Sequence, residues 1–354
     1  MKPFRVIDTG VREGRSQIAF DQALIELHRQ GHVPDTIRFL RFPPTALVGR
    51  HQALGQELKL DYCRDNDIGT ARRITGGGAI YLDPGQLGWE LVFSRSRLAL
   101  GMLDDYAKAI CEALASGLSD GFGIDARFRP RNDIEVEGRK ISGAGGFFDG
   151  DTMIYQGTVL VDLDPARMVA CLNVPQAKLQ KRGLDKAEQR VATLKDLLGG
   201  DTPEMSAVME AVLKGFSTGL GLELHHESPS DMEEALAAQH YTDEIGTDEF
   251  VHEIDDPAGA GLSTASQTGP GGTVTAHIRF DGPNESRIRE ILITGDFFVT
   301  PPRLIYDLEA SLRGVPVAEA GESVDQFFAT QKPDLLTIKP ADFRAAVEAA
   351  IGRR

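Results

Sequence analysis

The sequence predicts a mixed α/β protein of the α+β class, with two β-sheet regions flanked by helices and a small α+β unit near the C-terminus. Three observations predict this class. Short apolar-alternating runs and helical periodicity take turns over residues 4–95, a second β-rich stretch runs from Ala126 to Asp162, and strands reappear after residue 272. The length of 354 residues is enough for about two domains.

Periodicity places the individual elements. The helix expected at Ser16–Gln30 has Ala23, Leu24 and Leu27 on one face, as an amphipathic helix requires. The remaining expected elements, in chain order, are strands at 4–8 and 36–42, a helix at about 103–118, strands between 126 and 162 with turns at 137–138 and 149–150, a mainly helical stretch at 165–240, strands at 273–280 and 287–294, and helices at 302–312, 323–331 and 340–351.

A change of composition divides the chain. Residues Asp255 to Gly272 lose periodicity and collect Gly, Ser, Thr and Pro, which is typical of a linker or an exposed loop. We therefore expect a larger domain at 1–254, a linker or exposed loop at 255–272 and a small α+β domain at 273–354.

The composition limits the partners and the location of the protein. With 38 basic and 53 acidic residues the formal net charge is −15, which argues against nucleic acid or a membrane surface, because both attract positive charge. Cys63, Cys111 and Cys171 show neither a disulfide framework nor zinc-ligand spacing, so we expect buried thiols. The sequence has no secretory signal and no membrane-length apolar run, and a cytoplasmic protein is expected.

The most unusual segment is residues 72–81, which reads Arg-Arg-Ile-Thr-Gly-Gly-Gly-Ala-Ile-Tyr. Three consecutive glycines lack Cβ atoms, so the backbone can approach a ligand closely and offer its N–H groups to phosphate or carboxylate oxygens. The two preceding arginines supply permanent positive charge. A flexible turn with solvated arginines is the alternative interpretation. The segment fits neither the P-loop pattern nor the Rossmann glycine pattern.

A second candidate segment is a basic island within residues 127–146. Residues 127–140 hold five basic groups against three acidic ones, in a chain that is acidic overall. Lys140 is expected at the end of a strand, directly before a loop that reads Ile-Ser-Gly-Ala-Gly-Gly, so its ammonium would lie beside a second set of backbone N–H groups. A solvated surface lysine is the alternative. Asp133 could hold Mg²⁺ through a carboxylate oxygen or form an ion pair with Arg131.

Three motifs together resemble the signature set of the lipoate-protein ligase A family. They are Arg-Arg-x-Thr-Gly-Gly-Gly-Ala at 72–79, Arg-Asn-Asp at 131–133 and Gly-Arg-Lys-Ile-Ser-Gly at 138–143, and Val-Gly-Arg-His-Gln at 48–52 is similar to a further family stretch. The resemblance covers about residues 1–250. Thr-Gly-Asp-Phe-Phe at 294–298 is similar to the accessory domain that accompanies these ligases. The resemblance therefore implies the fold of biotin and lipoate protein ligases, with the accessory domain fused at the C-terminus.

The resemblance also implies a reaction, namely ATP-dependent attachment of lipoate or octanoate to a lysine of an acceptor protein through an acyl-adenylate. Lys140 would be the catalytic residue, bridging the acyl carboxylate and the α-phosphate, and Asp133 would bind Mg²⁺. The implied nucleotide-binding residues are Arg73, Gly78, Ala79, Ile80, Tyr81 and Lys140. The residues implied to bind the acyl group or the adenylate are Arg72, Thr75, Gly76, Gly77, Asn132, Ser142, Gly143 and Ala144, with Val48, Trp89 and Leu91 as candidate lining of an apolar tunnel.

The chain departs from the family pattern at three places. Thr75 replaces the family's usual serine and keeps the hydroxyl, whereas Leu82 replaces the histidine that usually follows the tyrosine. Pro-Gly-Gln-Leu at 84–87 is similar instead to lipoate-related octanoyltransferases, which use an acyl carrier in place of ATP. Some proteins of this fold carry a cysteine just upstream of the family's lysine, but here that stretch reads Arg-Pro-Arg-Asn-Asp.

Three functions stay open at this point. They are an ATP-dependent lipoate-protein ligase, a carrier-dependent octanoyl or lipoyl transferase, and a non-catalytic module that binds an acyl-adenylate or a biotin-like ligand. The implied partner is a lipoyl-acceptor domain of a 2-oxo-acid dehydrogenase, of the glycine-cleavage system, or of a lipoate-binding protein of sulfur oxidation. We expect a monomer that uses ATP, Mg²⁺ and lipoate or octanoate.

Overall fold

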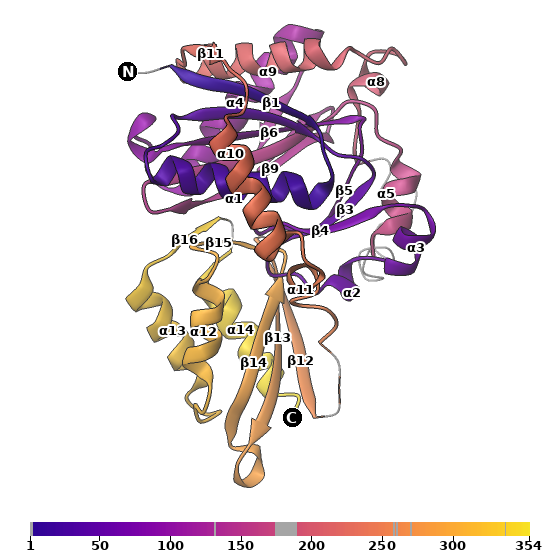
Figure 1. The fold of residues 1–354 in the computed structure, drawn as a ribbon. Coiled ribbons are helices and arrows are strands. Elements are labelled where there is room, and N and C mark those ends of the chain that lie inside the picture. The colour runs from indigo at the N-terminus through magenta and orange to yellow at the C-terminus, as the bar shows by residue number, and fades with distance from the viewer. Residues whose placement is uncertain are drawn as a thin grey trace.

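The computed structural model describes residues 3–130, 132–173, 190–257, 259, 261–269, 271–336 and 338–354. It is a mixed α/β fold, which confirms the predicted class (Figure 1). In Figure 1 the N-terminal two thirds form the upper part, and the orange and yellow C-terminal residues form the lower part. Within the part of the chain that the structure describes, no helix is long and apolar enough to cross a membrane.

An eight-stranded sheet forms the centre of the upper part. Its strands are β1 (Phe4–Val11), β2 (Thr36–Arg41), β6 (Gln86–Ser94), β7 (Arg127–Arg129), β8 (Asp133–Val136), β9 (Arg139–Asp149), β10 (Thr152–Leu160) and β11 (Leu224–His226), in the order β11-β1-β2-β6-β10-β9-β8-β7. β1 pairs in parallel with β11 and β2, and every later neighbour pair is antiparallel. The two β-rich stretches therefore join in one sheet, because β6 pairs with β10 along its whole length.

Helices cover both faces of this sheet (Figure 1). The long ones are α1 (Gly14–Arg29), α4 (Leu103–Phe122), α9 (Met205–Leu220) and α10 (Asp231–His240). The shorter ones are α2 (Leu54–Glu57), α3 (Leu60–Asp65), α5 (Pro165–Cys171), α8 (Leu194–Leu197) and α11 (Asp248–Val251), with single turns at 95–97, 241–245 and 283–285. α4 and α9 pack on one face around Trp89 and Phe216, and α1 packs on the other face around Phe20 and Leu24.

A second, small sheet lies beside the large one. It contains β3 (Thr45–Val48), β4 (Gly69–Arg72) and β5 (Ile80–Leu82), in the order β4-β3-β5. β3 is parallel to β4 and antiparallel to β5. The glycine segment at 75–78 is the connection from β4 to β5, so the small sheet fixes both of its ends.

The C-terminal residues form a third, antiparallel sheet covered by helices. The elements are β12 (Leu262–Gly269), β13 (Gly272–Asp281), β14 (Arg287–Gly295), α12 (Leu304–Leu312), α13 (Ala320–Gln331) and α14 (Pro340–Ile351), and a two-stranded ribbon of β15 (Phe298–Thr300) and β16 (Asp334–Leu336). The buried members of one hydrophobic cluster all lie between Ala265 and Ala350. This part of the chain thus has its own core.

The predicted linker at 255–272 is wrong in part, because it contains β12. This strand pairs with β13 from Leu262 to Gly269. Its side chains are mostly Ser, Thr and Gln on both faces, and hydroxyl groups bond across the strands, as between Ser266 and Thr275 at 2.8 Å. An edge strand without apolar alternation has the composition of a loop, which explains the error.

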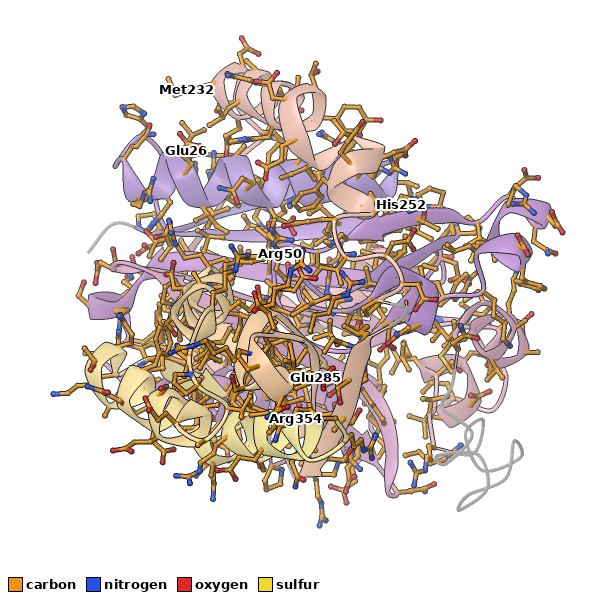
Figure 2. The ribbon with its side chains drawn as sticks, turned by 90° about the horizontal axis from the view of Figure 1, so that it is seen from below. Glu26, Arg50, Met232, His252, Glu285 and Arg354 are labelled. Atoms are coloured by element: carbon orange, nitrogen blue, oxygen red, sulfur yellow. The ribbon has the colours of Figure 1, made fainter. Side chains whose placement is uncertain are left out.

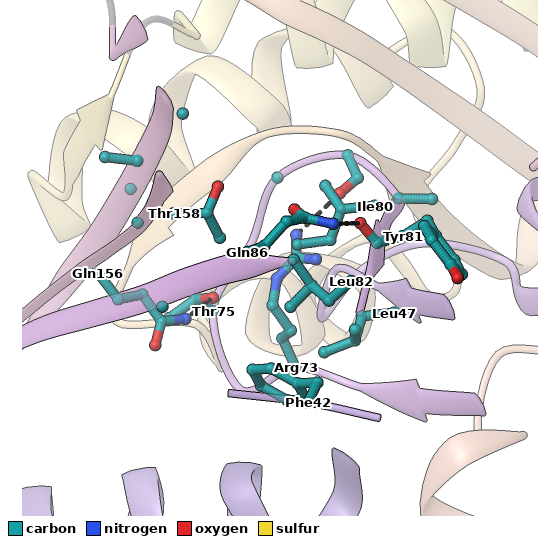
Figure 3. Close-up of a pocket in the computed structure, with 18 of the residues that line it drawn as sticks. Phe42, Leu47, Arg73, Thr75, Ile80, Tyr81, Leu82, Gln86, Gln156 and Thr158 are labelled. Carbon is teal, nitrogen blue, oxygen red and sulfur yellow. Dashed lines mark hydrogen bonds between the residues drawn. The ribbon is translucent and has the colours of Figure 1, made fainter. Parts of the chain in front are cut away.

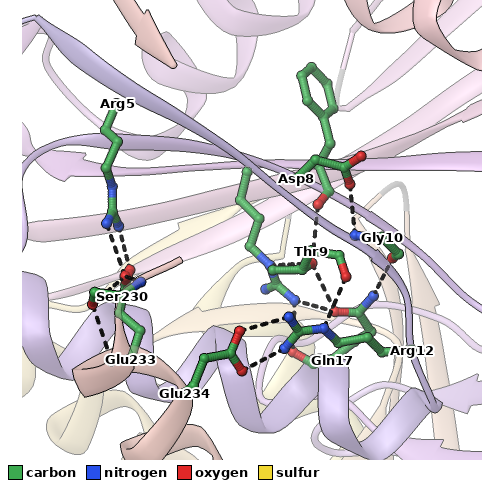
Figure 4. Close-up of polar contacts among 11 residues, drawn as sticks. Arg5, Asp8, Thr9, Gly10, Arg12, Gln17, Ser230, Glu233 and Glu234 are labelled. Atoms are coloured by element: carbon green, nitrogen blue, oxygen red, sulfur yellow. Dashed lines mark hydrogen bonds and ion pairs between the residues drawn. The ribbon is translucent and has the colours of Figure 1, made fainter. Parts of the chain in front are cut away.

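Two arginines near the N-terminus hold α10 in place (Figure 4). Arg5, on β1, forms a bidentate ion pair with Glu233, with one N–O distance of 2.9 Å, and both side chains are buried. Arg12 forms a similar pair with Glu234 at 2.7 and 2.8 Å, but 43% of the Glu234 side chain is exposed. Burial alone would raise the pKa of Glu233, yet its contacts to Arg5 and Ser230 hold that pKa below its ordinary value.

These two pairs should contribute differently to stability. Arg5→Gln should lower the free energy of unfolding by about 3 to 5 kcal/mol, because it leaves the Glu233 carboxylate buried without a counter-charge. Arg12→Gln, the matched control, should cost less than about 1 kcal/mol, because its pair is exposed to water. Urea unfolding at neutral pH measures both values, and equal losses would contradict the prediction.

The Arg5 contribution should also depend on pH. Because the pKa of Glu233 is lowered in the folded state, this stabilisation is fully present above the ordinary glutamate pKa of about 4.3 and is lost as the pH falls through the lowered pKa. The difference in unfolding free energy between Arg5→Gln and the wild type should therefore shrink in acid, and a difference that grows there would contradict this sign.

Candidate functional site

A cavity of about 350 Å³ lies between the small sheet and strands β9 and β10 (Figure 3). Its polar lining includes the glycine segment, Asn132 and Lys140, and Gln156 and Thr158 on β10, together with Asp21, Arg73 and Gln86. Its apolar lining includes Ile18, Leu40, Phe42, Leu47, Leu82 and Trp89. The volume is typical of a small-molecule site. A polar end beside an apolar one suits an anion that carries a hydrocarbon tail.

Most of the residues predicted for the site line this cavity. Those that do are Arg73, Thr75, Gly76, Gly77, Gly78, Ala79, Ile80, Tyr81, Asn132, Lys140, Gly143 and Ala144. Arg72, Asp133 and Ser142 do not. Of the candidate tunnel residues, Trp89 lines the cavity, whereas Val48 and Leu91 do not.

Arg73 is a buried cation that lies two residues before the glycine segment. Its side chain is buried, and Nη2 donates to the carbonyl oxygens of Gly76 at 3.1 Å and Gly78 at 2.8 Å. Nη1 is also buried and has no hydrogen-bond partner among the described residues. Burial lowers the pKa of Arg73 to about 10, so the guanidinium stays charged at neutral pH. A buried donor without an acceptor is costly, and an anion in the cavity could supply the missing acceptor.

The glycine segment is fixed from both sides. Gly77 has a φ of +95°, which favours glycine, and its N–H donates to the carbonyl of Phe297 at 3.1 Å. The Thr75 hydroxyl accepts a hydrogen bond from Nε2 of Gln156 at 2.9 Å, and Figure 3 shows these two side chains together. The expected row of free backbone donors is therefore incomplete, because the N–H of Gly77 faces the C-terminal residues.

Arg72 has a structural position, which corrects the binding role expected for it. Its side chain is 1% exposed, and its guanidinium donates to backbone carbonyls at 2.7 to 3.3 Å. These carbonyls belong to Gly49, Arg50, Gln52, Phe250, Val251 and Ile254. Arg72 thus ties β4 to the residues around α11, which follow α10 in the chain. The two side chains go to different places, because Arg72 is the last residue of β4 and bonds to backbone carbonyls, whereas Arg73 follows the strand and lines the cavity.

Lys140 lies at the cavity in an ion pair. Its Nζ is 2.7 Å from Oδ1 of Asp133, whose other oxygen pairs with Arg129. A Cβ at position 143 would approach Cε of Lys140 to 2.6 Å, so Gly143 leaves the room that the lysine needs. Burial alone would raise the pKa of Asp133, but Lys140 and Arg129 hold it below its ordinary value.

Asp133 does not fit the predicted Mg²⁺ site. Each of its oxygens already pairs with a cation. Within the described ranges, no group of three or more His, Cys, Asp or Glu side chains is placed to hold a metal. Magnesium in nucleotide sites is bound by one or two carboxylates together with phosphate oxygens. Asp133 could serve in that way only after releasing Lys140 or Arg129, so it is a partner of the lysine in this structure.

The glycine-rich stretch after Lys140 is a strand and not the predicted loop. Lys140 stands near the start of β9, and Gly143 and Gly145 pair with Thr158 and Gln156 of β10. Their backbone groups therefore belong to the sheet. The Ser142 hydroxyl is buried without a hydrogen-bond partner in the described part of the chain, and it lies outside the cavity.

Asn132 closes the edge of β9 at the cavity. Its Nδ2 donates to the carbonyl of Ala144, and its own carbonyl accepts from the N–H of Ala144 at 2.9 Å. Its neighbour Arg131, the first residue of the Arg-Asn-Asp motif, lies outside the described residues. Asn132 therefore fixes the backbone of β9 at Ala144, which is part of the cavity wall.

Sequence reasoning missed several lining residues. Gln156 and Thr158 flank Gly157 on β10, and their signal was a polar pair inside an otherwise apolar strand. Gly145 and Phe298 also line the cavity. Phe298 comes from β15, far along the chain, and nothing local in the sequence connects it to the glycine segment.

No thiol is available in the cavity. Cys63, Cys111 and Cys171 are all described and buried, as predicted, and none of them lines the cavity. Burial raises the pKa of Cys111 and of Cys171 to about 12 and also raises that of Cys63. A reactive thiolate requires a lowered pKa and access to the ligand, and these cysteines have neither.

Comparison with known proteins gives relatives of two activities. The chain is 28% identical over 246 residues to lipoate-protein ligase A subunit 1 of Thermoplasma acidophilum, covering 67% of this chain and 91% of the relative. It is 26% identical over 281 residues to octanoyltransferase LipM of Halalkalibacterium halodurans, covering 71% of this chain and 99% of the relative.

Two solved structures are similar to this chain. A crystal structure of lipoate-protein ligase A bound with ATP matches with a TM-score of 0.62 and 26% identity, covering 72% of this chain and all of that one. The structure of P. falciparum LipL1 in complex with lipoate matches over the whole of both chains with a TM-score of 0.76, and at 16% identity it shows the fold alone.

The sequence model of one protein family, the lipoyl protein ligase A/B catalytic domain, matches residues 13–217. This range contains the glycine segment, Lys140 and β10. This range is more than half of the chain, and it includes all of the predicted site residues. The resemblance found in the three sequence motifs is thereby confirmed, and the chain belongs to the lipoyl protein ligase A/B catalytic domain family.

Proposed function

We propose that this protein attaches lipoate, or the related octanoate, to a lysine of an acceptor protein in an ATP-dependent reaction through an acyl-adenylate. The observation that carries the proposal is the cavity, which joins Arg73 and Lys140 to an apolar lining around Leu82 and Trp89. The family and the similarity to a ligase crystallised with ATP support a nucleotide and an acyl chain as its ligands.

The first step would join two anions. A carboxylate oxygen of the acid attacks the α-phosphorus of ATP, the bond to the β-phosphate oxygen breaks, and pyrophosphate leaves with the electron pair. Such a step depends on positioning and on stabilising negative charge. The Lys140 ammonium would lie between the carboxylate and the α-phosphate, while Nη1 of Arg73 would gain the acceptor that it lacks.

The second step would transfer the acyl group. The neutral amine of the acceptor lysine attacks the acyl carbon, the carbon–oxygen bond to AMP breaks, and the amine loses a proton as the amide forms. No covalent bond to this chain is required. Because both oxygens of Asp133 are paired with Arg129 and Lys140, the proposed reaction takes Mg²⁺ as the counter-ion of ATP.

A carrier-dependent octanoyltransferase is the second candidate, since LipM is among the relatives. A transferase of this kind with a covalent intermediate needs a nucleophile beside the lysine. The three cysteines lie outside the cavity, and burial raises their pKa values. The ion pair between Lys140 and Asp133 also argues against a module that only binds its ligand.

The acceptor would be a lipoyl domain. A solved structure similar to this chain describes a bipartite lipoate protein ligase from T. acidophilum and its E2 lipoyl domain. We propose an acceptor of the same kind, from a 2-oxo-acid dehydrogenase, the glycine-cleavage system or a lipoate-binding protein of sulfur oxidation. Residues 1–254 would form the catalytic domain and residues 273–354 the accessory domain.

The central test is lipoate-dependent release of pyrophosphate. The purified protein with lipoate and ATP should release pyrophosphate and, once an acceptor domain is added, should modify its lysine. A coupled phosphate assay and the mass of the acceptor measure the two steps. Absence of lipoate-dependent pyrophosphate together with octanoyl transfer from an acyl carrier would identify a transferase, and tight binding without modification would identify a binding module.

Lys140→Ala should reduce pyrophosphate release by at least about 10²-fold, because one charged group at the reacting anions is lost. Lys195→Ala is the matched control. The two lysines have similar surroundings. The Lys195 side chain is 41% exposed and its Nζ lies 2.9 Å from Asp162, and the Lys140 side chain is 40% exposed and its Nζ lies 2.7 Å from Asp133. Of the two, only Lys140 lines the cavity. Equal rates in the two variants would refute the role of Lys140.

Asp133→Asn separates a positioning role from a metal-binding one. If Asp133 holds Lys140 in place, kcat should fall on the order of 10²-fold, because the ammonium is no longer fixed at the reacting atoms. The Mg²⁺ concentration that gives half-maximal rate should stay the same. A marked rise in that concentration would show instead that the carboxylate binds the metal during turnover.

A further inference from the structure

One wall of the cavity comes from the C-terminal part of the chain. Phe298, the first residue of β15, is partly buried and lines the cavity together with residues of the glycine segment and of β9. The remaining lining belongs to residues 18–191. A single aromatic ring therefore brings the C-terminal part into the proposed reaction site.

The ring occupies a slot that two glycines leave open. A Cβ at Gly77 would stand 2.6 Å from Cζ and 3.1 Å from Cε2 of Phe298. A Cβ at Gly145 would overlap Cζ and Cε1 of the same ring. The tip of the ring thus lies between the glycine segment and β9, and a larger residue at either position would displace it.

The backbone just before Phe298 is fixed to the N-terminal part. The Phe297 carbonyl accepts from the N–H of Gly77 at 3.1 Å, and the N–H of Gly295 donates to the carbonyl of His51 at 3.0 Å. The rings of His51 and Phe297 stack with centroids 5.3 Å apart. The ring of Phe298 therefore reaches the cavity when the C-terminal part is docked on the N-terminal part.

A polar cluster supports the same contact from the outside. Arg50 pairs with Glu253, which also accepts a hydrogen bond from the Tyr306 hydroxyl of α12 at 3.1 Å. Figure 2 shows Arg50 well inside the outline of the molecule in the view from below. Both backbone and side-chain contacts therefore hold β15 against the cavity.

Phe298 stands at the charged end of the cavity. The Cβ position of Gly77 that meets the ring is also 3.3 Å from Nη2 of Arg73. The ring and the guanidinium are thus neighbours at the same glycine. An apolar ring at this place excludes water from the anions, and excluding water strengthens their attraction to Arg73 and Lys140.

We propose that Phe298 is a positioning residue that closes the charged end of the cavity against water, so that docking of the C-terminal part completes the reaction site. The inference rests on the proposed function. An acyl-adenylate is open to attack by water at the acyl carbon, which breaks the carbon–oxygen bond to AMP and gives free acid and AMP. A closed cavity leaves the acceptor lysine as the nucleophile that reaches the acyl carbon.

The first experiment measures access to the cavity and does not require enzymatic activity. Trp89 is the sole tryptophan of the chain, is fully buried and lines the cavity, so quenching of its fluorescence by acrylamide reports access of small solutes. Phe298→Ala should raise the quenching constant by about twofold or more, because it opens the wall. Phe327→Ala is the matched control, a partly buried phenylalanine of α13 that packs on the C-terminal core away from the cavity.

The second experiment measures coupling. The ratio of AMP released to acyl groups transferred should be near one in the wild type and in Phe327→Ala, and should rise several-fold in Phe298→Ala as water competes with the acceptor. Phe298→Leu should restore most of the coupling. A loss of folded protein would lower both products equally and leave the ratio unchanged, so the ratio separates closure from stability.

A second variant keeps the test decisive if Phe298→Ala does not fold. Gly145→Ala retains the ring and displaces it from its slot, so it should raise both the quenching constant and the coupling ratio. Unchanged quenching in Phe298→Ala and in Gly145→Ala would overturn the inference. Absence of lipoate-dependent pyrophosphate in the wild type would overturn the proposed function alone, because the quenching experiment would still decide whether Phe298 closes the cavity.

Discussion

Burial of two adjacent guanidinium groups is the constraint on which the site depends. A buried cation is costly unless it is fully partnered. Arg72 satisfies this demand with the backbone carbonyls of two chain segments, and in doing so fixes the start of the glycine segment. Arg73 satisfies it incompletely, with one terminal nitrogen bonded to the segment itself and the other without a partner among the described residues. The backbone thus satisfies one arginine fully, whereas the next one keeps a buried donor without an acceptor among the described residues.

This arrangement reaches across much of the molecule. The carbonyls at Phe250, Val251 and Ile254 are in place because α10, which precedes them, is held on the sheet by Arg5 and Arg12. The glycine segment therefore depends on a helix more than 150 residues away in the sequence. On its other side the same segment contacts Phe297, so it is held between two late parts of the chain.

Much of this was predictable from the sequence, and the failures have physical reasons. Lys140, Arg73 and the three glycines were found because their residue types are unusual together. Arg73 was assigned to the nucleotide and Arg72 to the acyl group or the adenylate, but the contacts of Arg72 with Val251 and Ile254 join segments far apart in the chain and leave no local signal. The glycines of β9 suggested a loop, although their function is to admit neighbouring side chains at Gly143 and Gly145. Phe298 could not be found, because its contact with the cavity exists only after the two parts of the chain pack together.

The two cores belong to one chain, and this affects how fast the Phe298 ring can enter its slot. A ring that must enter a slot on a separate molecule would do so in proportion to the concentration of its partner, and dilution would empty the slot. The chain between α11, which ends at Val251, and β12, which begins at Leu262, replaces that encounter by an intramolecular one. For a short tether the effective concentration is on the order of millimolar. Re-formation of the complete cavity then follows first-order kinetics, and its rate constant does not depend on the protein concentration.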